Sequence, residues 1–488
     1  MVTSPLKILF VASEVEGLVK TGGLADVARA LPLNLARQGH DVRIILPFYQ
    51  TLKRRDEAKL IASRWLPTPP DRADISYRIY QLELDGVCVY LLDCPQYFER
   101  PQLYAENNQA YPDNGERFAF FCAAALHACE QQGFAPDIAH CNDWHTGLLP
   151  LLLKTRYAGN PFFQHTRSVI SIHNAAFQGV FDRPQFWALP EITDYERRIN
   201  YDYGHINLLK CGVLYADKIN AVSPNYANEL LTHLGAHGMA SVFQQRASDL
   251  CGILNGCDYQ DWDPASDSYL PATYDADHLD GKRLCKQTLQ QEAGLPTADL
   301  PIYGMVCRLT EQKGVHLLIP TLTKFLQHQV QLVIVGSGDP SLAAQLQAIA
   351  QQHADKFAFI NAYDDRLAHL VEAGADFFLM PSLFEPCGLN QMYSLAYGTL
   401  PLVRAVGGLK DTVVDWDADP ARATGFCFND PTASTLLDAM RRSLLHYLQE
   451  PERFAKVQRT AMQTRFNWAD SVTQYEQMYR DALARGKH

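Results

Sequence analysis

Short apolar runs alternate with amphipathic segments along most of the 488-residue chain. The run KILFVAS at residues 7–13 is typical of a buried strand, and residues 24–39 carry apolar side chains at helical spacing up to a glycine. The run DVRIILP at residues 41–47 again predicts a strand. Strand, helix and strand form a βαβ unit, which implies parallel strands joined by a right-handed crossover.

The same alternation runs through both halves of the chain. Further buried strands are predicted in the first half within residues 87–93, 137–143, 167–174 and 218–224. A second set of strands and helices begins near Pro301. Residues 255–277, between the two sets, are rich in Asp, Pro and Tyr and lack periodicity, so we interpret them as the connection between two domains. The fold class expected is α/β, with two doubly wound parallel sheets.

The amino-acid composition argues against several classes of protein. Hydrophobic residues make up 47% of the chain and charged residues 20%, which is typical of a globular protein with a large core. The formal net charge of −11 argues against a nucleic-acid partner. The 12 cysteines are scattered and form no C-x-x-C pair, so we expect reduced thiols. No signal peptide or membrane-length apolar run is visible, and we therefore expect a soluble, cytoplasmic protein with no membrane partner.

The loops that follow strands carry the candidate chemistry, because doubly wound sheets bind ligands at the carboxyl ends of their strands. Lys20 to Gly23 lie between a predicted strand and a predicted helix. Adjacent glycines let a backbone approach a ligand closely, a helix N-terminus favours an anion, and lysine adds a charge for phosphate. A tight turn with a solvated lysine fits this short pattern equally well.

The second half repeats this arrangement with more charge. Arg308 and Lys313 lie in the loop after its first strand, where two cations suit a diphosphate. Gly336 and Gly338 form a glycine-rich turn after the next strand, and its amides could face a phosphate. This turn is neither a G-x-G-x-x-G fingerprint nor a P-loop, so a dinucleotide site and ATP hydrolysis have no motif in their favour.

The segment from Met380 to Leu402 is the most unusual. An apolar strand leads through Glu385, Cys387 and Gly388 into a predicted helix, whose first amides could bind an anion or sugar hydroxyls. A plain helix cap with a buried thiol is the simpler alternative.

In the first half, polar residues gather at two strand ends. Asp143 and His145 follow one strand, and His173 and Asn174 follow another. Such groups suit carbohydrate hydroxyls, although a lone histidine is more often structural. No cluster has metal-ligand spacing, and the D-x-D patterns are interpreted as solvated loops; they lie at Asp261/Asp263, Asp275/Asp277 and Asp415/Asp417.

Taken together, these loops resemble the family of bacterial glycogen synthases and plant starch synthases. The resemblance covers nearly the whole chain, and its motifs occur in family order: KTGGLADV, HNAAFQG, AVSP, GILNGCDYQDWDP, RLTEQKG, GSGDP, FEPCGLNQMYSLAYGTLPLVRAVGGLKDTV and FNWADSVTQYEQMY. Any one of these motifs is weak evidence for the resemblance, but the whole set in this order is specific to the family.

The resemblance implies a GT-B fold, in which two Rossmann-like domains face each other across a deep cleft. It implies a first domain over residues 1–254, completed by a C-terminal helix over 467–488, and a second domain over 255–466. It implies a retaining glucosyltransferase that moves glucose from ADP-glucose to the nonreducing end of glycogen or a maltooligosaccharide, releasing ADP. Neither a metal nor an organic cofactor is expected, and the sequence leaves the oligomeric state open.

The resemblance also implies roles for single residues. Lys20, Gly22 and Gly23 correspond to the first domain's part of the donor site, and His173 to an active-site histidine near the transferred sugar. The catalytic set implied is Lys20, His173, Arg308, Lys313 and Glu385. The donor loops of the second domain correspond to Gly336, Gly338, Glu385, Cys387, Gly388 and Leu389, with Tyr363 packed on the adenine. The sugar sites correspond to Tyr104, Asp143, Asn174 and Asn255.

Two positions depart from the common family pattern. Asn390 follows C-G-L where many relatives carry Thr, and Ala175 stands where Leu is commoner. These departures leave open whether the donor is ADP-glucose or UDP-glucose. A GT-B enzyme with another donor or acceptor, and a glucan- or nucleotide-binding protein without turnover, are the alternatives. Breaking a glycosyl–phosphate bond builds negative charge on the diphosphate, so Arg308 and Lys313 suit its stabilisation.

Overall fold

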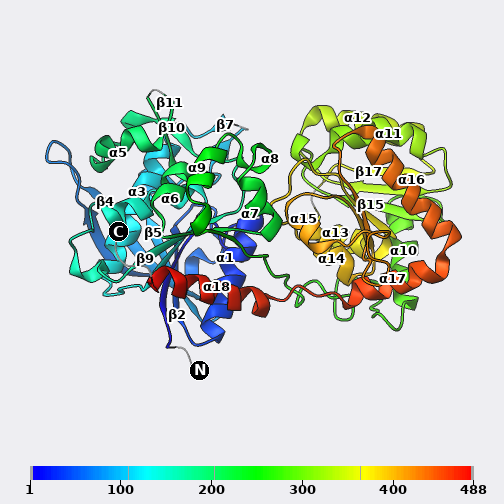
Figure 1. Ribbon diagram of the computed structural model, residues 1–488, viewed down its shortest axis with the longest axis horizontal. Coiled ribbons are helices and arrows are strands. Elements are labelled where there is room, and N and C mark those ends of the chain that lie inside the picture. Colours follow the sequence, from blue (N-terminus) through cyan, green and yellow to red (C-terminus); the bar gives the residue numbers. More distant parts are fainter. Residues whose placement is uncertain (1–3, 108, 203, 363, 485–488) are drawn as a thin grey trace. The chain divides into compact units, whose positions relative to one another are not determined.

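The structure is a computed structural model that describes residues 4–107, 109–202, 204–362 and 364–484. The chain divides into two compact units: unit 1 comprises Met1–Asn255 and Trp468–His488, and unit 2 comprises Gly256–Asn467. Each unit holds its own β-sheet flanked by helices (Figure 1). Among the described residues, no helix is both long and apolar enough to cross a membrane.

The main sheet of unit 1 has the strand order β14-β13-β9-β8-β1-β2-β5-β4-β3. Strands from β14 to β5 run parallel, whereas β4 and β3 continue the sheet antiparallel. The strands of this sheet are β1 (Lys7–Val11), β2 (Asp41–Pro47), β3 (Lys59–Leu66), β4 (Ile75–Leu84), β5 (Val87–Asp93), β8 (Ile138–Asn142), β9 (Arg167–Ile172), β13 (Lys218–Ala221) and β14 (Leu250–Gly252). The parallel strands are nearly continuous apolar runs, as expected for strands buried on both faces.

Short strands and helices complete unit 1. The short strands are β6 (Ala105–Glu106), β7 (Gln109–Ala110), β10 (Val180–Asp182), β11 (Asn200–Asp202) and β12 (His205–Asn207). The helices are α1 (Gly23–Arg37), α2 (Pro95–Phe98), α3 (Asn114–Gln131), α4 (Leu149–Lys154), α5 (Glu191–Ile199), α6 (Leu208–Tyr215), α7 (Pro224–Leu230), α8 (His233–Ala236), α9 (Ala240–Gln245) and α18 (Trp468–Ala484).

The C-terminal helix α18 packs in unit 1, against α1 and β9, although it is far from both in sequence (Figure 1). Its Tyr479 hydroxyl lies 2.7 Å from His140 Nδ1, and its Tyr475 hydroxyl accepts from Asn220 Nδ2 at 2.9 Å. Burial lowers the pKa of His140 to about 3, so this imidazole is neutral. Hydrogen bonds to buried residues of the sheet therefore hold this helix in place, in addition to apolar packing.

The sheet of unit 2 is parallel throughout, with the order β17-β16-β15-β18-β19-β20. Its strands are β15 (Ile302–Val306), β16 (Gln331–Val335), β17 (Phe357–Ile360), β18 (Phe377–Met380), β19 (Leu400–Arg404) and β20 (Phe426–Phe428). Its helices are α10 (Asp280–Glu292), α11 (Val315–Phe325), α12 (Pro340–Gln352), α13 (Asp365–Gly374), α14 (Asn390–Ala396), α15 (Gly407–Thr412), α16 (Ala433–Gln449) and α17 (Pro451–Gln463).

Alternate side chains of the unit 2 strands enter different cores. Leu332 and Ile334 of β16 belong to one hydrophobic cluster, whereas Val333 and Val335 belong to another. Because successive side chains of a strand point to opposite faces, helices must cover both faces of this sheet. The doubly wound α/β architecture predicted from the alternation of strands and helices is confirmed.

The acidic connection expected from the sequence packs on unit 2. Trp262 stacks between the rings of His369 and Tyr393, with centroid distances of 3.6 and 4.0 Å. The buried Asp267 carboxylate lies 2.7 Å from His369 Nδ1 and accepts from the Tyr397 hydroxyl at 2.5 Å. Aromatic stacking and a buried carboxylate thus hold a segment whose sequence shows no periodicity.

Candidate active site

The loop that leads into α1 carries Lys20 on the surface of unit 1. Lys20 Nζ contacts Asp26 Oδ1 at 2.7 Å and Glu16 Oε2 at 2.9 Å. Burial disfavours the ammonium, but the two carboxylates outweigh it and raise the pKa of Lys20 above its usual value. Lys20 is therefore a charged group held in place by two acidic side chains, while 41% of its side chain stays exposed.

Sequence reasoning missed Glu14, which organises the backbone of this loop. The Glu14 carboxylate is buried and accepts from Thr21 N–H and Gly22 N–H, and from the Thr21 hydroxyl at 2.6 Å. It also accepts from the Tyr104 hydroxyl at 2.7 Å. An acidic residue directly after a strand was the available signal, but its partner Tyr104 lies 90 residues away. The amides of Thr21 and Gly22, expected to favour a ligand anion, are bonded to this internal carboxylate.

Gly22 and Gly23 face open space. A Cβ added to either residue would have no heavy atom within 4 Å in the part of the chain that the structure describes. Gly22 has an extended backbone with φ −158°, which any residue can adopt. Packing inside unit 1 therefore does not explain these glycines, and their role beside a ligand stays a prediction.

Asp143 follows β8 in a strained backbone conformation, with φ 53°. Its Oδ1 accepts from His173 N–H at 2.7 Å and from Asn174 N–H at 3.4 Å, so it joins the ends of β8 and β9. Burial raises the pKa of Asp143 to about 7, although both N–H bonds oppose the shift. The structure thus brings together Asp143, His173 and Asn174, which the sequence placed at the ends of two strands.

His173 has one defined tautomer. Asn142 Nδ2 donates to Val11 O at 2.9 Å, which leaves Asn142 Oδ1 to accept from His173 Nε2 at 2.9 Å. His173 Nε2 therefore carries the proton, and Nδ1 is the acceptor. Burial lowers the pKa of His173 to about 3, so the ring is neutral at physiological pH. A neutral acceptor suits a sugar hydroxyl better than a phosphate.

Asn174 and Asn255 are two further residues of unit 1 that the sequence predicted for the sugar sites. The Asn174 side chain caps its own loop by accepting from Ala176 N–H at 3.0 Å. The exposed ring of Phe177 follows in the same loop. Asn255 is buried, and its Oδ1 has no hydrogen-bond partner among the described residues. A buried acceptor without a partner is a feature to expect where a ligand or water donates.

In unit 2, Lys313 and Glu385 form an ion pair. Lys313 Nζ lies 2.6 Å from Glu385 Oε2, and the Ser382 hydroxyl donates to the same oxygen at 3.1 Å. Glu385 is buried, whereas the side chain of Lys313 is 27% exposed. Arg308, in the same loop as Lys313, is exposed. The structure therefore joins the loops after β15 and β18, which the sequence placed 72 residues apart.

The glycines of unit 2 pack backbone against backbone. A Cβ on Gly336 would lie 2.0 Å from Cys307 O, and a Cβ on Gly338 would lie 2.4 Å from Leu309 O. The loop at Gly407 and Gly408 packs in the same manner against the backbone of Glu385 and Cys387. These glycines have a structural reason that is independent of any phosphate.

The loop before α14 is tightly held. Gln391 Nε2 donates to Cys387 O at 3.1 Å and to Gly388 O at 3.0 Å. Gly388 has φ 74°, in the left-handed region, and Leu389 immediately precedes α14. Tyr363, expected beside the adenine, lies outside the described residues, and its role stays a prediction.

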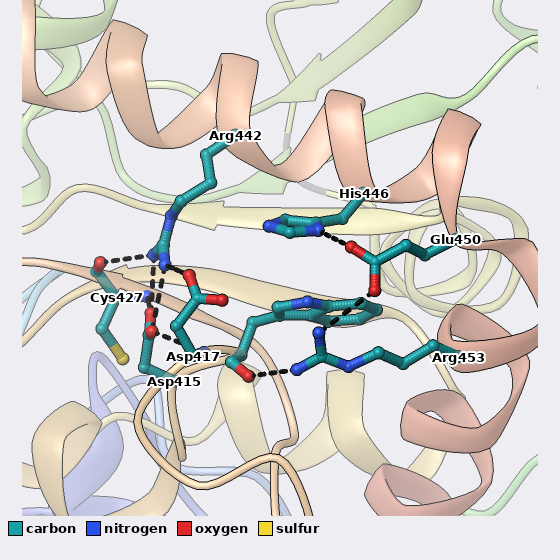
Figure 2. Close-up of polar contacts among 8 residues, drawn as sticks. Asp415, Asp417, Cys427, Arg442, His446, Glu450 and Arg453 are labelled. Atoms are coloured by element: carbon teal, nitrogen blue, oxygen red, sulfur yellow. Dashed lines mark hydrogen bonds and ion pairs between the residues drawn. The ribbon is translucent and has the colours of Figure 1, made fainter.

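A separate cavity of unit 2, with a volume of about 620 Å³, is lined by residues of β20 and α16 around Asp415. Figure 2 shows the polar contacts of Asp415, Asp417 and Arg442. The Asp415 carboxylate accepts from both Arg442 terminal nitrogens, at 3.0 and 2.6 Å, and from Cys427 N–H at 2.6 Å. Arg442 also bonds to Asp417 at 2.6 Å. Interpreting Asp415 as part of a solvated loop was therefore wrong, because Arg442 on α16 and the Cys427 amide hold its carboxylate, whose side chain is only 18% exposed. Asp417 keeps an exposed side chain, as the sequence predicted.

The described residues contain no group of three or more His, Cys, Asp or Glu side chains that could hold a metal ion. The cysteines are free thiols, as their scattered spacing predicted.

Two family models match the chain. Residues 7–245 match the starch synthase catalytic domain, and residues 286–460 match the glycosyl transferases of group 1. These two matches lie in unit 1 and unit 2, respectively.

Known proteins match over nearly the full length. The chain is 85% identical to a glycogen synthase of Aeromonas salmonicida, over 99% of this chain and 100% of that protein. It is 59% identical to a glycogen synthase of Photobacterium profundum, over 97% of this chain and 94% of that protein. The solved catalytic domain of starch synthase IV from Arabidopsis thaliana, bound to ADP and acarbose, matches with a TM-score of 0.90 and 31% identity, covering 99% of this chain and 100% of that one.

Proposed function

The chain belongs to the glycogen synthase family of glycosyltransferases, and we propose that it elongates an α-1,4-glucan by moving glucose from ADP-glucose to the nonreducing end, with retention at the anomeric carbon and release of ADP. One observation carries the proposal for the donor. The starch synthase IV domain, whose fold matches this chain with a TM-score of 0.90, holds ADP and acarbose.

The chemistry proposed for unit 2 is stabilisation of the leaving group. As the glycosyl–phosphate bond breaks, negative charge grows on the diphosphate. Lys313 and Arg308 supply positive charge from one loop, and Glu385 holds the Lys313 ammonium at 2.6 Å. Fixed cations need no reorganisation during the reaction, which is the condition for efficient electrostatic catalysis.

The chemistry proposed for unit 1 is recognition of sugar hydroxyls. His173 presents an unprotonated Nδ1, because its Nε2–H is bonded to Asn142. The Asp143 carboxyl is bonded to the amides of His173 and Asn174 and so fixes the backbone that presents this ring. A neutral ring in a defined tautomer presents one fixed acceptor that can orient a hydroxyl donor.

We propose a same-face displacement, in which the departing phosphate receives the proton of the incoming glucan hydroxyl. A double displacement would need a carboxylate nucleophile and a second acid/base carboxyl about 5 Å apart. Glu385 is engaged by Lys313 and Ser382, and Glu14 by the loop before α1. Buried carboxylates that already accept several bonds are poor nucleophiles, which favours the same-face route.

The test is glucose incorporation into glycogen by the purified full chain, with ADP-glucose and UDP-glucose supplied in parallel and a metal chelator in a matched series. We expect incorporation from ADP-glucose at the same rate with and without chelator. An exo-glucosidase specific for α-1,4 bonds should release the newly added glucose.

Other results would change the proposal in stated ways. Incorporation from UDP-glucose alone would keep the reaction and replace the donor. Loss of activity with chelator would add a metal requirement. Tight glucan binding without incorporation from either donor would replace the enzyme by a binding protein.

A further inference from the structure

Two loops of unit 1 meet at one buried carboxylate. The lysine loop comprises residues 20–23, and the tyrosine loop comprises the described residues 99–107 and 109–113. Glu14 Oε2 accepts from the amides of Thr21 and Gly22, while Glu14 Oε1 accepts from the hydroxyls of Thr21 and Tyr104 at 2.6 and 2.7 Å. Glu14 is 4% exposed, so water does not compete for these bonds.

The hydroxyl of Tyr104 is locked in its donor role. It lies 2.7 Å from Glu14 Oε1 and 2.8 Å from Ser13 Oγ. A carboxylate is the stronger acceptor, so the single proton points to Glu14 and Ser13 donates in return. Burial and then the Glu14 charge raise the pKa of Tyr104 well above its usual value, so this proton is retained.

The tyrosine loop is anchored at its other end by a buried arginine. Arg117 of α3 is fully buried and donates to Leu103 O at 3.0 Å and to Asn114 Oδ1 at 2.6 Å. Asn114 Nδ2 in turn donates to Tyr104 O at 2.9 Å. A continuous path of hydrogen bonds therefore runs from α3 through Tyr104 and Glu14 to the lysine loop. Buried hydrogen bonds of this kind favour one geometry, because each broken bond leaves an unpaired polar group.

We propose that Glu14 is a positioning residue that couples the lysine loop to the tyrosine loop, so that the donor-side and glucan-side residues of unit 1 are held by one carboxylate. The inference rests on the proposed function, which assigns Lys20 to the nucleotide sugar and Tyr104 to the glucan. Disturbing one loop must then be felt at the other, although the two loops are far apart in sequence.

The direct test replaces Glu14 in two steps. Glu14→Ala removes the acceptor for every bond, and we expect kcat/KM for ADP-glucose to fall by about 100-fold, the scale on which displaced catalytic groups lose rate. For Glu14→Gln we expect kcat/KM for ADP-glucose to fall by only about tenfold. Its amide oxygen can still accept from Thr21 and Gly22, and its amino group can donate to the two hydroxyls.

The coupling itself is tested by single-atom changes on each loop. Thr21→Val removes a hydroxyl from the lysine loop, and we expect it to raise the KM for glycogen. Tyr104→Phe removes a hydroxyl from the tyrosine loop, and we expect it to raise the KM for ADP-glucose. In the Glu14→Ala background neither change should add a further loss. If each change alters only the KM of its own loop's substrate, the proposal is wrong.

A control and a second readout separate loss of coupling from loss of stability and from failure of the proposed function. Tyr97→Phe removes a like bond of unit 1, from the Tyr97 hydroxyl to Glu116 Oε1 at 2.5 Å, outside both loops; it should lower the melting temperature without changing either KM. Amide hydrogen exchange in residues 14–24 should accelerate in Tyr104→Phe and not in Tyr97→Phe. If the parent chain transfers no glucose, the proposed function fails, and exchange alone decides the coupling. Unchanged exchange in Tyr104→Phe would overturn the inference.

Discussion

Glycine pairs follow strands in both units, but for different physical reasons. In unit 1, Gly22 and Gly23 have no atom within 4 Å of an added Cβ among the described residues. In unit 2, a Cβ added to Gly336 or Gly338 would lie 2.0 or 2.4 Å from a carbonyl oxygen of the neighbouring loop. The second pair therefore lets two loops of the chain pack, whereas packing does not explain the first pair.

The charged and polar groups of the two units also differ. In unit 2 a buried carboxylate fixes a lysine, Glu385 with Lys313. In unit 1 the buried carboxylate Glu14 fixes backbone amides and hydroxyls, His173 is neutral, and the charged candidate is Lys20 on the donor-side loop. Fixed positive charge suits the diphosphate, and neutral hydrogen-bonding groups suit sugar hydroxyls. The predictions below probe this division of labour.

Lys313→Ala should have the largest effect. We expect kcat for glucose transfer to fall by about 10²–10³-fold, as for other groups that stabilise developing negative charge. Steady-state kinetics with ADP-glucose and glycogen checks this. Because the change leaves Glu385 as a buried charge without its lysine, denaturant unfolding of the same variant measures the accompanying loss of stability. If the variant folds and turns over nearly as fast as the parent chain, Lys313 does not stabilise the leaving diphosphate.

Gly336→Ala should be the largest purely structural effect. The added Cβ would lie 2.0 Å from Cys307 O, a backbone atom that cannot rotate away. We expect unit 2 to lose about 3 kcal/mol of unfolding free energy, measured by denaturant unfolding. Gly159→Ala in unit 1, where an added Cβ meets no heavy atom of the described residues within 4 Å, is the matched control and should be neutral. Equal stability of both variants would contradict packing as the reason for Gly336.

Gly23→Ala should separate the two kinds of glycine turn. Because its Cβ would enter open space, we expect no change in melting temperature. If the space admits the donor, the KM for ADP-glucose should rise about tenfold, the effect of about 1.4 kcal/mol of lost binding. Thermal unfolding and initial-rate kinetics on the same preparation provide both values. A lowered melting temperature with an unchanged KM would assign this glycine to folding.

Much of the fold could be predicted from local patterns. The apolar run at residues 41–47 is strand β2, and the alternation of strands and helices predicted the doubly wound sheets. The fold class and the glycosyltransferase family implied by the ordered motifs are confirmed by the family matches and by the starch synthase structure. These features depend on periodicity and motif order, which a single sequence contains.

The site could be predicted only in part, because its bonds join residues distant in sequence. Nothing local in the sequence connects Glu14 with Tyr104, and the Gly336 turn reads the same whether a phosphate or Cys307 O faces it. The tautomer of His173 depends on Asn142, which is itself oriented by Val11. The catalytic roles of these residues therefore stay predictions, as does that of Tyr363.

Asp143→Asn tests the polar character of unit 1 by its pH dependence. Burial raises the pKa of Asp143 to about 7 in the folded chain, whereas an unfolded aspartate titrates near pH 4. Between these values the folded state keeps a proton that the unfolded state has lost, so this group's stabilisation declines as pH rises towards 7. The carboxamide of the variant does not titrate, and its oxygen can still accept from His173 N–H. The unfolding free energy of the variant minus that of the parent chain should therefore increase by about 1 kcal/mol per pH unit from pH 5 to 6.5 and level off above pH 7. Denaturant unfolding at half-unit pH steps measures this difference, and a difference independent of pH would mean that Asp143 is ionised throughout, giving unit 1 a fixed negative charge beside the proposed sugar site.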